Sequence, residues 1–218
     1  MKKNIFYFLL ILFSAHLNAQ VRGSIDLGLY RHTDFQESGY IQGGLGLEVQ
    51  VYKFLKPEFG VSYYYGRLED YNKLDAVGNI TNISQVKASA LNFGFTPKIC
   101  LSCVEYSAGD VLLQILPIYN ISKIEAQQNY TTINQNNPSQ SKTQKDIVTE
   151  WQQSVGIGIG IDIILSDKNY DSLAVNLYYT GVNMGKAIGE VESTETRYDS
   201  RTLGLGLNYY FGFKKKKD

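Results

Sequence analysis

Proline, histidine, cysteine and long apolar runs are all scarce in this chain of 218 residues. The sequence has four Pro, two His and two Cys. Its longest apolar run, Ile5–Phe13, is much shorter than the roughly 20 apolar residues that a membrane-spanning helix needs. This argues against a bundle of membrane helices. Two thiols are too few to hold a structural zinc ion, and we expect neither a metal nor a cofactor.

Tyrosine, phenylalanine and glycine are abundant instead, at 17, 10 and 20 residues. This mixture favours strands and tight interior packing over helices. Acidic and basic residues balance at 21 each. Because there is no basic excess, nothing in the composition indicates a nucleic-acid partner.

The amino terminus has the three regions of a secretory signal peptide. Lysines at positions 2 and 3 precede the apolar run, and small and polar residues then lead to Ala19. We expect cleavage after Ala19, so that residues 1–19 form the signal peptide and residues 20–218 form one mature domain. Loss of the two lysines leaves 19 basic residues (21 minus 2) against 21 acidic ones, a net charge of −2.

The stretch SVGIGIGIDIILSD, residues 154–167, alternates aliphatic residues with glycine. In a helix the aliphatic residues would spread around the whole circumference, and each interior glycine would cost about 1 kcal/mol relative to alanine. In a strand the aliphatic residues share one face, and the glycines and Asp162 share the other. The sequence therefore predicts a strand here.

Seven further segments alternate in the same way. They are residues 24–30, 42–53, 58–66, 88–96, 111–121, 172–181 and 202–213. Pro117 interrupts one of them and predicts a bulge. Together with residues 154–167 they make eight strands, an even number.

The connections between these strands are alternately short and long. Short links fall around residues 54–58, 100–107 and 166–171, and longer polar links fall around 31–39, 67–85, 122–148 and 185–200. Short turns at one end and long loops at the other are typical of bacterial outer-membrane barrels, whose termini face the periplasm. The predicted fold is therefore all-β: an eight-stranded antiparallel up-and-down transmembrane β-barrel.

A soluble eight-stranded barrel would have the opposite polarity. Lipocalin-like barrels keep apolar residues inside, around a ligand, and polar residues outside. Here one face of the strands is almost purely aliphatic and aromatic, whereas the other mixes Gly, Ser, Asn, Gln, Tyr and a few charges. An eight-stranded barrel has just enough interior for side chains. We therefore expect lipid outside, and glycine neighbours inside for Tyr64, Tyr178 and Tyr210.

This pattern of strands and loops resembles that of the small eight-stranded outer-membrane proteins typified by OmpX and the barrel of OmpA. The last strand ends in NYYFGF, residues 208–213, which looks like the aromatic-terminated signal that such proteins present to the outer-membrane assembly machinery. The resemblance implies export to the cell outer membrane and contact with its lipid and lipopolysaccharide. The family usually ends on the aromatic residue, whereas Lys214–Lys217 and Asp218 follow here. We interpret them as a solvated periplasmic tail, with contact to anionic headgroups as the alternative.

Barrels of this size that transfer or remove lipid A acyl chains use His with Ser, Asp or Glu near the outer leaflet. The resemblance therefore makes His32, Asp34 and Ser38 candidate catalytic residues. However, a loop histidine beside an aspartate is common, and His32 is the only histidine after position 19. The chain also lacks the amino-terminal amphipathic helix of the acyl-transferring barrel and the His-x-Ser pair of the deacylase. We therefore expect no enzyme.

Five charged residues fall on the inner face of the predicted barrel. They are Arg22, Asp26, Glu48, Lys98 and Asp162. Charged residues within a membrane are often functional, so an ion pathway is one interpretation. In so narrow a barrel we favour a structural network in which acids and bases pair across the lumen.

Cys100 and Cys103 form the motif CLSC in a predicted periplasmic turn. The spacing alone allows a redox pair or half of a metal site. A redox pair normally lies at a helix amino terminus that lowers the thiol pKa, and a hairpin turn offers none. We favour a turn disulfide, or two unpaired thiols, without a catalytic role.

Three functions remain open: a nonenzymatic surface protein that binds a partner or supports the envelope, a lipid A-modifying enzyme, and a narrow channel or secretion-complex accessory. We predict the first, with the loop at residues 122–148 as its binding surface. Strand-forming residues flank a centre, NQNNPSQS, that is rich in turn formers. We expect a ribbon that projects beyond the membrane, resembling the projecting sheet of OmpX, and that binds an extracellular partner along its edge.

Overall fold

The computed structural model describes residues 20–33, 38–67, 71–102, 107–166, 170–179, 182, 184–191 and 202–212. The predicted signal peptide, Asp34, Cys103 and the Lys214–Lys217 tail lie outside these residues. Within the described ranges, no helix has both the length and the apolar character needed to cross a membrane.

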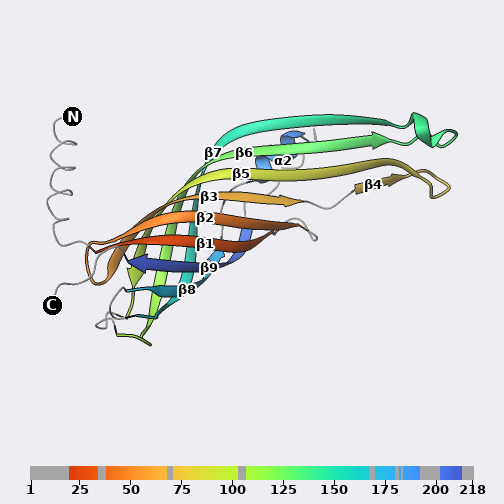
Figure 1. Cartoon of the computed structure of the whole chain (residues 1–218). Coiled ribbons are helices and arrows are strands. Elements are labelled where there is room, and N and C mark those ends of the chain that lie inside the picture. The colour runs from red at the N-terminus through yellow and green to blue at the C-terminus, as the bar shows by residue number, and fades with distance from the viewer. Residues whose placement is uncertain are drawn as a thin grey trace, which may run out of the picture.

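Eight antiparallel strands close into a barrel (Figure 1). They are β1 (Gln20–His32), β2 (Gly39–Gln50), β3 (Leu55–Arg67), β5 (Ile80–Cys100), β6 (Val111–Thr132), β7 (Lys142–Ile164), β8 (Ser172–Tyr179) and β9 (Thr202–Gly212). Each strand of the ring pairs with its neighbours along the chain, and β9 closes the ring on β1 through pairs such as Leu27 with Leu207. The predicted all-β, up-and-down barrel is confirmed. We call the end with the short turns, where β1 begins and β9 ends, the lower end, and the end with the long connections the upper end.

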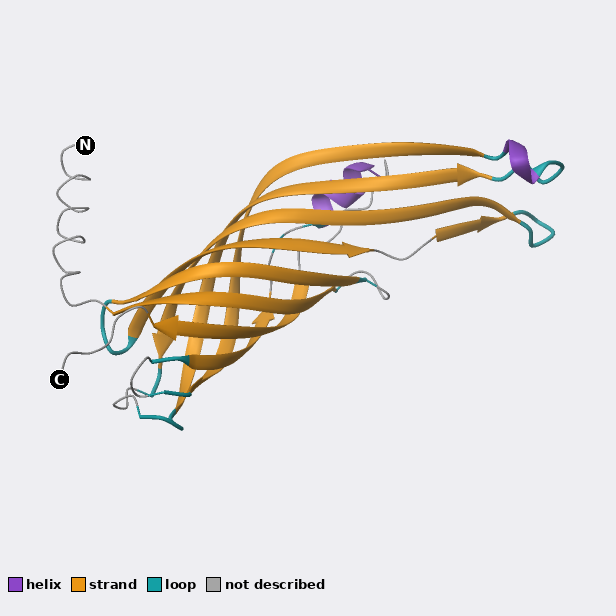
Figure 2. Cartoon of the chain, viewed as in Figure 1, coloured by secondary structure: helices purple, strands orange, loops and turns teal. Residues whose placement is uncertain are grey.

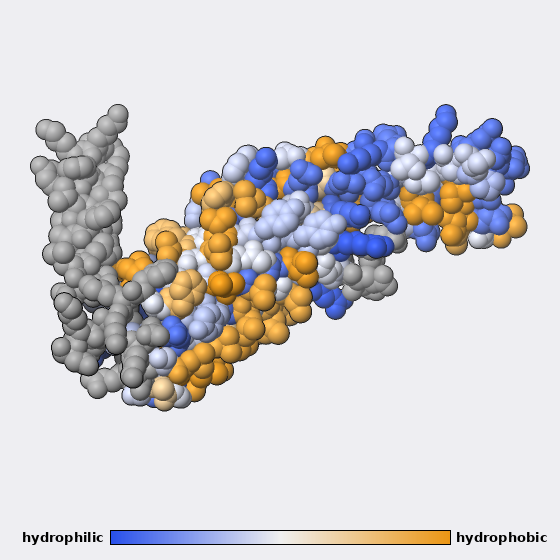
Figure 3. All heavy atoms as spheres, viewed as in Figure 1, coloured by the Kyte–Doolittle hydropathy of each residue, from blue (hydrophilic) through white to orange (hydrophobic). Residues whose placement is uncertain are grey.

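The outer face of the barrel is apolar, as the alternation predicts. Leu29 and Ile41 expose 64% and 60% of their surface, and every strand of the ring contributes similar residues. Figure 3 shows apolar side chains gathered over the barrel, whereas hydrophilic ones predominate over its upper extension, with some apolar ones among them. An apolar surface of this extent is unfavourable in water, whereas a closed ring with all its strands paired satisfies the backbone in lipid. The exterior is that of a transmembrane barrel.

The predicted link at residues 54–58 is wrong, because the turn spans residues 51–54 and β3 already begins at Leu55. Pro57 does not prevent this. The pairing of β2 with β3 extends only to Glu48 and Glu58, and Glu58 is the residue that follows the proline. The missing amide of Pro57 therefore removes nothing from that ladder.

The predicted bulge at Pro117 is also wrong. The ladder between β6 and β7 passes through Pro117 and Ile157 without a shift. Pairing of β6 with β5 lapses below Tyr119 and resumes at Ile115 in the same register. Pro117, which lacks an amide hydrogen, therefore coincides with a gap in one ladder and adds no extra residue to the strand.

Strands β5, β6 and β7 continue past the apolar region as a protruding sheet (Figure 2). β6 and β7 stay paired as far as Thr132 and Lys142, and the 3-10 helix η2 (Pro138–Gln140) lies between them at the tip. The predicted ribbon at residues 122–148 is thus confirmed. It is not isolated, because β5 pairs with it along its length and β4 (Tyr71–Leu74) pairs with β5. The link predicted at residues 67–85 therefore contains β4 and the start of β5.

The polarity of strands β5 and β6 reverses where they leave the barrel. On β5, Leu91 and Phe93 face outward below this level. Above it Lys87 lies on the outward face, whereas Val86 and Ala88 are buried on the inward face. Apolar residues outside indicate lipid, and apolar residues inside indicate an aqueous exterior. The reversal therefore marks the upper boundary of the membrane on this side of the barrel.

Candidate functional site

Six buried charged residues meet in the lower lumen, and we call them the ion cluster. They are Arg22, Glu48, Lys56, Glu58, Lys98 and Asp162. They come from β1, β2, β3, β5 and β7, at positions that alternate with the lipid-facing residues. Desolvating so many charges is tolerated only when each has a close partner of opposite sign.

Lys98 is at the centre of the ion cluster. Its ammonium donates to Glu48 Oε2 at 2.9 Å, forms an ion pair with Glu58, and donates to the hydroxyl of Tyr210. The Tyr210 hydroxyl in turn donates to Glu58 Oε2 at 3.2 Å, and the ammonium lies 3.8 Å from the centroid of the Tyr210 ring. One cation thus forms ion pairs with two carboxylates from neighbouring strands.

Arg22 connects the other side of the ion cluster. Its Nε donates to Glu48 Oε1 at 2.8 Å, and its Nη2 lies 3.3 Å from Asp162 Oδ2. Its Nη1 donates to Ser172 Oγ at 2.8 Å. Lys56 Nζ approaches the same Asp162 oxygen at 4.0 Å. These contacts join opposite walls of the barrel across its axis.

Four of the five charges predicted for the lumen belong to the ion cluster, and the fifth does not. Asp26 lies above it and accepts a hydrogen bond from Asn208 Nδ2 at 2.7 Å. Lys56 and Glu58 were missed because residues 54–58 were interpreted as a turn. The alternation of Lys56 and Glu58 with Pro57 and Phe59 is the signal that could have located them.

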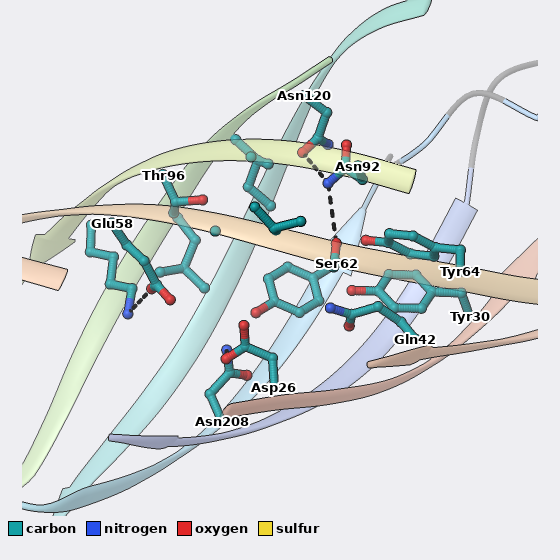
Figure 4. A pocket seen from close by; sticks show the side chains of 17 residues that line it. Asp26, Tyr30, Gln42, Glu58, Ser62, Tyr64, Asn92, Thr96, Asn120 and Asn208 are labelled. Atoms are coloured by element: carbon teal, nitrogen blue, oxygen red, sulfur yellow. Dashed lines mark hydrogen bonds and ion pairs between the residues drawn. The ribbon is translucent and has the colours of Figure 1, made fainter. Parts of the chain in front are cut away.

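A polar chamber of about 90 Å³ lies directly above the ion cluster (Figure 4). On one wall Asn92 Nδ2 donates to Asn120 Oδ1 at 3.0 Å and to Ser62 Oγ at 3.3 Å. Asp26 and Asn208 lie on the opposite wall. At roughly 10–15 Å³ per water centre, the chamber has room for several waters. It is enclosed from below by Glu58 and Lys98, which also line it.

Three tyrosines close the chamber from above. The ring of Tyr30 lies 5.2 Å from that of Tyr64 at 63°, and 6.0 Å from that of Tyr178 in a stacked arrangement. We call them the tyrosine layer. A Cβ added at Gly204 would overlap the Tyr30 ring, and one added at Gly158 would lie 2.8 Å from the Tyr178 ring. The predicted need for glycine next to an inward tyrosine is therefore confirmed for Tyr178.

A short helix, α2 (Gly185–Val191), covers the upper lumen. It lies in the link predicted at residues 185–200 and contacts β6 and β7. Its Ala187, Ile188 and Val191 join the tyrosine layer and the inward face of β5 and β6 in one buried apolar cluster. This plug was not predicted from the sequence. The signal was available in the small apolar residues, such as Ala88 and Ala126, that replace polar ones on the inward face.

We expect Ile188→Asp to undock α2 without unfolding the barrel. Ile188 is fully buried. Burying even a neutral polar group without a hydrogen bond costs roughly 2–7 kcal/mol, and an unpaired carboxylate costs more, whereas each 1.4 kcal/mol shifts an equilibrium tenfold. The reporter would be the Ala126→Cys variant in a Cys100→Ser, Cys103→Ser background, because Ala126 is buried in the same cluster. Thiol labelling of that cysteine should accelerate more than about tenfold in the Ile188→Asp variant.

Glu190→Ala is the matched control, because Glu190 is exposed on the same helix. It should leave the labelling rate unchanged. Equal labelling in the Ile188→Asp and control proteins would contradict the assignment of α2 as a cover.

The catalytic candidates are not arranged as a catalytic group in the part of the chain that the structure describes. His32 is buried, and Ser38 Oγ accepts from its backbone amide at 3.0 Å and donates to its carbonyl at 3.2 Å. Ser38 thus closes the connection between β1 and β2 through the main chain of His32. Asp34 lies outside the described residues.

The cysteine motif is placed only in part. Cys100 is buried at the lower end of β5, but Cys103 lies outside the described residues, so the disulfide stays a prediction. In the described ranges no three His, Cys, Asp or Glu side chains are grouped so that they could hold a metal ion.

Solved structures with a similar arrangement are outer-membrane proteins of low sequence identity. One is a major outer membrane protein from Thermus thermophilus, with 13% identity and a TM-score of 0.47 over 88% of this chain and 99% of that one. Others are CarO of Acinetobacter baumannii (12%, 0.42, 89% and 98%) and Ail, the attachment invasion locus protein of Yersinia pestis (8%, 0.40, 89% and 97%). No family model matches the chain, and no curated protein matches it. Independently of these likenesses, the closed ring, the apolar exterior and the long connections at one end make the chain a small β-barrel of the outer-membrane type.

Proposed function

We propose that the chain is a nonenzymatic outer-membrane protein whose protruding sheet binds an extended segment of another protein. The observation that carries the proposal is the open edge of β7. β8 pairs with β7 only between Ile157 and Ile164. Above Ile157, no other described strand pairs with that side of β7 as far as its start at Lys142.

An open strand edge presents a row of amide and carbonyl groups to which another chain can add a strand. Side chains beside this edge could provide specificity. Ile147 and Trp151 expose 50% and 63% of their surface there. Lys142 and Lys145 lie near the tip, where charged residues limit pairing with further copies of the same edge. The edge therefore combines main-chain hydrogen bonding with apolar anchors.

The contents of the lumen argue against the two alternatives. The ion cluster, the tyrosine layer and α2 close the barrel at three successive levels, which disfavours a channel. The Ser38 hydroxyl bonds the main chain of His32, which disfavours lipid A chemistry. With the short turns in the periplasm, as in other barrels of this type, the protruding sheet faces the exterior of the cell.

Photo-crosslinking of the protein on intact cells tests the proposal. The full-length protein is compared with a variant whose protruding sheet is shortened. A photoreactive residue at Thr149, on the open edge of β7, should give one discrete protein adduct. Replacing residues 129–145 with Asn-Gly keeps Gln128 opposite Asp146 in its present register, so the shortened hairpin remains compatible with the barrel. The truncation removes Lys142 and Lys145 from the open edge but keeps Ile147 and Trp151, so it should weaken the adduct.

Two controls make the result decisive. The truncated protein should still resist SDS and shift in gel mobility after boiling, because the closed ring is intact. A photoreactive residue at Lys123, which has β5 on one side and β7 on the other, should give no adduct. The absence of an adduct at Thr149, or equal adducts at full strength from the truncated protein, would contradict the proposal.

A further inference from the structure

The lipid-facing surface of the barrel has an apolar groove of about 800 Å³. It crosses β8, β9, β1, β2 and β3 just below the upper end of the barrel. Its walls include Leu27, Leu29, Ile41, Tyr63, Tyr65 and Leu205. Its volume falls within the roughly 300–1,000 Å³ of ordinary ligand pockets. It is separate from the protruding sheet and from the lumen.

Gly43 creates the floor of this groove. It faces lipid on β2, where its partners across the sheet are Leu27 and Tyr63. A Cβ at Gly43 would meet no atom within 4 Å, so packing does not require glycine here. This contrasts with the inward glycines, which make room for tyrosine rings. The missing side chain leaves a depression among large apolar neighbours.

Two arginines lie directly above the groove. Arg67 is the next outward residue after Tyr65 on β3, and Arg31 is the next after Leu29 on β1; both are exposed. Between them on β2 is Gly39, which pairs with Arg67 and has nothing within 4 Å of an added Cβ. Since the pairing of Tyr30 with Tyr40 places Gly39 beside Arg31, the three residues form one row.

The spacing of this row suits a phosphate group. Arg31 and Arg67 are two strand spacings apart, about 10 Å, so that both side chains can reach a group held over Gly39. Guanidinium groups bind phosphate oxygens through paired hydrogen bonds. Here the basic row lies at the water boundary, and the apolar groove runs from it toward the membrane interior.

We propose that this surface is a binding site for one phosphorylated lipid of the outer leaflet. The headgroup phosphate lies between Arg31 and Arg67 above Gly39, and an acyl chain fills the groove over Gly43. The arginines select the headgroup and the groove holds the chain. This site goes beyond the proposed protein binding and does not depend on it.

Native mass spectrometry of the detergent-solubilised mature protein tests the proposal. It compares the binding of phosphatidic acid with that of phosphatidylcholine, both with the same acyl chains. The protein should retain one phosphatidic acid molecule in preference to phosphatidylcholine. Arg31→Gln and Arg67→Gln should each weaken phosphatidic acid binding about fivefold, and the double variant should do so by up to about 25-fold. Gly43→Leu, whose Cβ meets nothing within 4 Å and whose side chain occupies the groove, should weaken binding of both lipids.

Matched variants and one soluble probe decide the outcome. Lys123→Gln removes an exposed charge on β6, and Ile157→Phe enlarges a lipid-facing residue on β7; neither should change binding. Glycerol 3-phosphate, which has no acyl chain, should bind far more weakly than phosphatidic acid. Each variant must first pass the heat-modifiability check. Equal phosphatidic acid binding by the wild type and the double arginine variant, or equal binding of glycerol 3-phosphate, would overturn the proposal.

Discussion

Replacing Lys98 with Met should lower the free energy of unfolding by about 3–5 kcal/mol, because removing one partner of a buried ion pair leaves an uncompensated charge. Glu48 and Glu58 both lose their contact with the ammonium in this variant. Arg22 still neutralises Glu48, but within the described part of the chain Glu58 keeps only hydrogen bonds from Ser24 and Tyr210. We therefore expect most of the loss to arise at Glu58.

A urea titration of the barrel in lipid vesicles would measure this effect. Trp151 is the single tryptophan, and its fluorescence would report unfolding. Lys123→Met, at an exposed position outside the ion cluster, is the control and should change stability by less than about 0.5 kcal/mol. Adding Glu58→Gln to Lys98→Met should recover part of the loss, because it removes the stranded charge. Equal stability of the Lys98→Met protein and the control would mean that the ion cluster does not hold the strands together.

Gly204→Ala should destabilise the barrel by about 1–3 kcal/mol through overpacking of its interior. The added methyl group would overlap the Tyr30 ring. That ring cannot easily yield, since Tyr64 and Tyr178 pack against it. The same urea titration measures the loss. The effect should be largely reversed by a second change, Tyr30→Val, which removes the ring.

Gly43→Ala is the matched control for this prediction. It adds the same methyl group on the outward face, where nothing lies within 4 Å, so stability should change by less than about 0.5 kcal/mol. If both alanine variants were equally stable, the inward glycines would not be required by the tyrosine layer.

The ring of eight strands was predictable because alternation repeats in every strand. A strand such as β7 has period 2 along its length, and lipid outside requires an apolar residue at each outward position. The same alternation placed Arg22, Glu48, Lys98 and Asp162 on the inner face. Lys56 and Glu58 were not predicted, since residues 54–58 were assigned to a short link. The pairing of β3 with β5, in which Pro57 lies opposite Pro97, shows that the strand includes them.

The plug and the lipid-facing groove depend on information that local patterns do not contain. α2 is a short helix, and it packs against residues such as Ala88 and Ile124. These lie on β5 and β6, which the fold brings together beneath the helix. The groove depends on which residues stand beside Gly43 on β1 and β3. Alternation assigns each residue to a face, but it does not fix the register between strands.

The reversal of polarity along β5 and β6 also determines how deeply the protein sits in the membrane. If the barrel moved relative to the bilayer by the length of two residues, every side chain would stay on its face of the sheet, but the strands would shift by about 7 Å along their length. If the protein moved down by this distance, Lys87 and the outward residues at its level would approach lipid. If it moved up, Leu91 and Ile121 would be lifted into water. Either displacement exposes the wrong surface on two adjacent strands at once. These strands therefore fix the height of the protruding sheet above the bilayer, and with it the distance at which a partner must approach the cell.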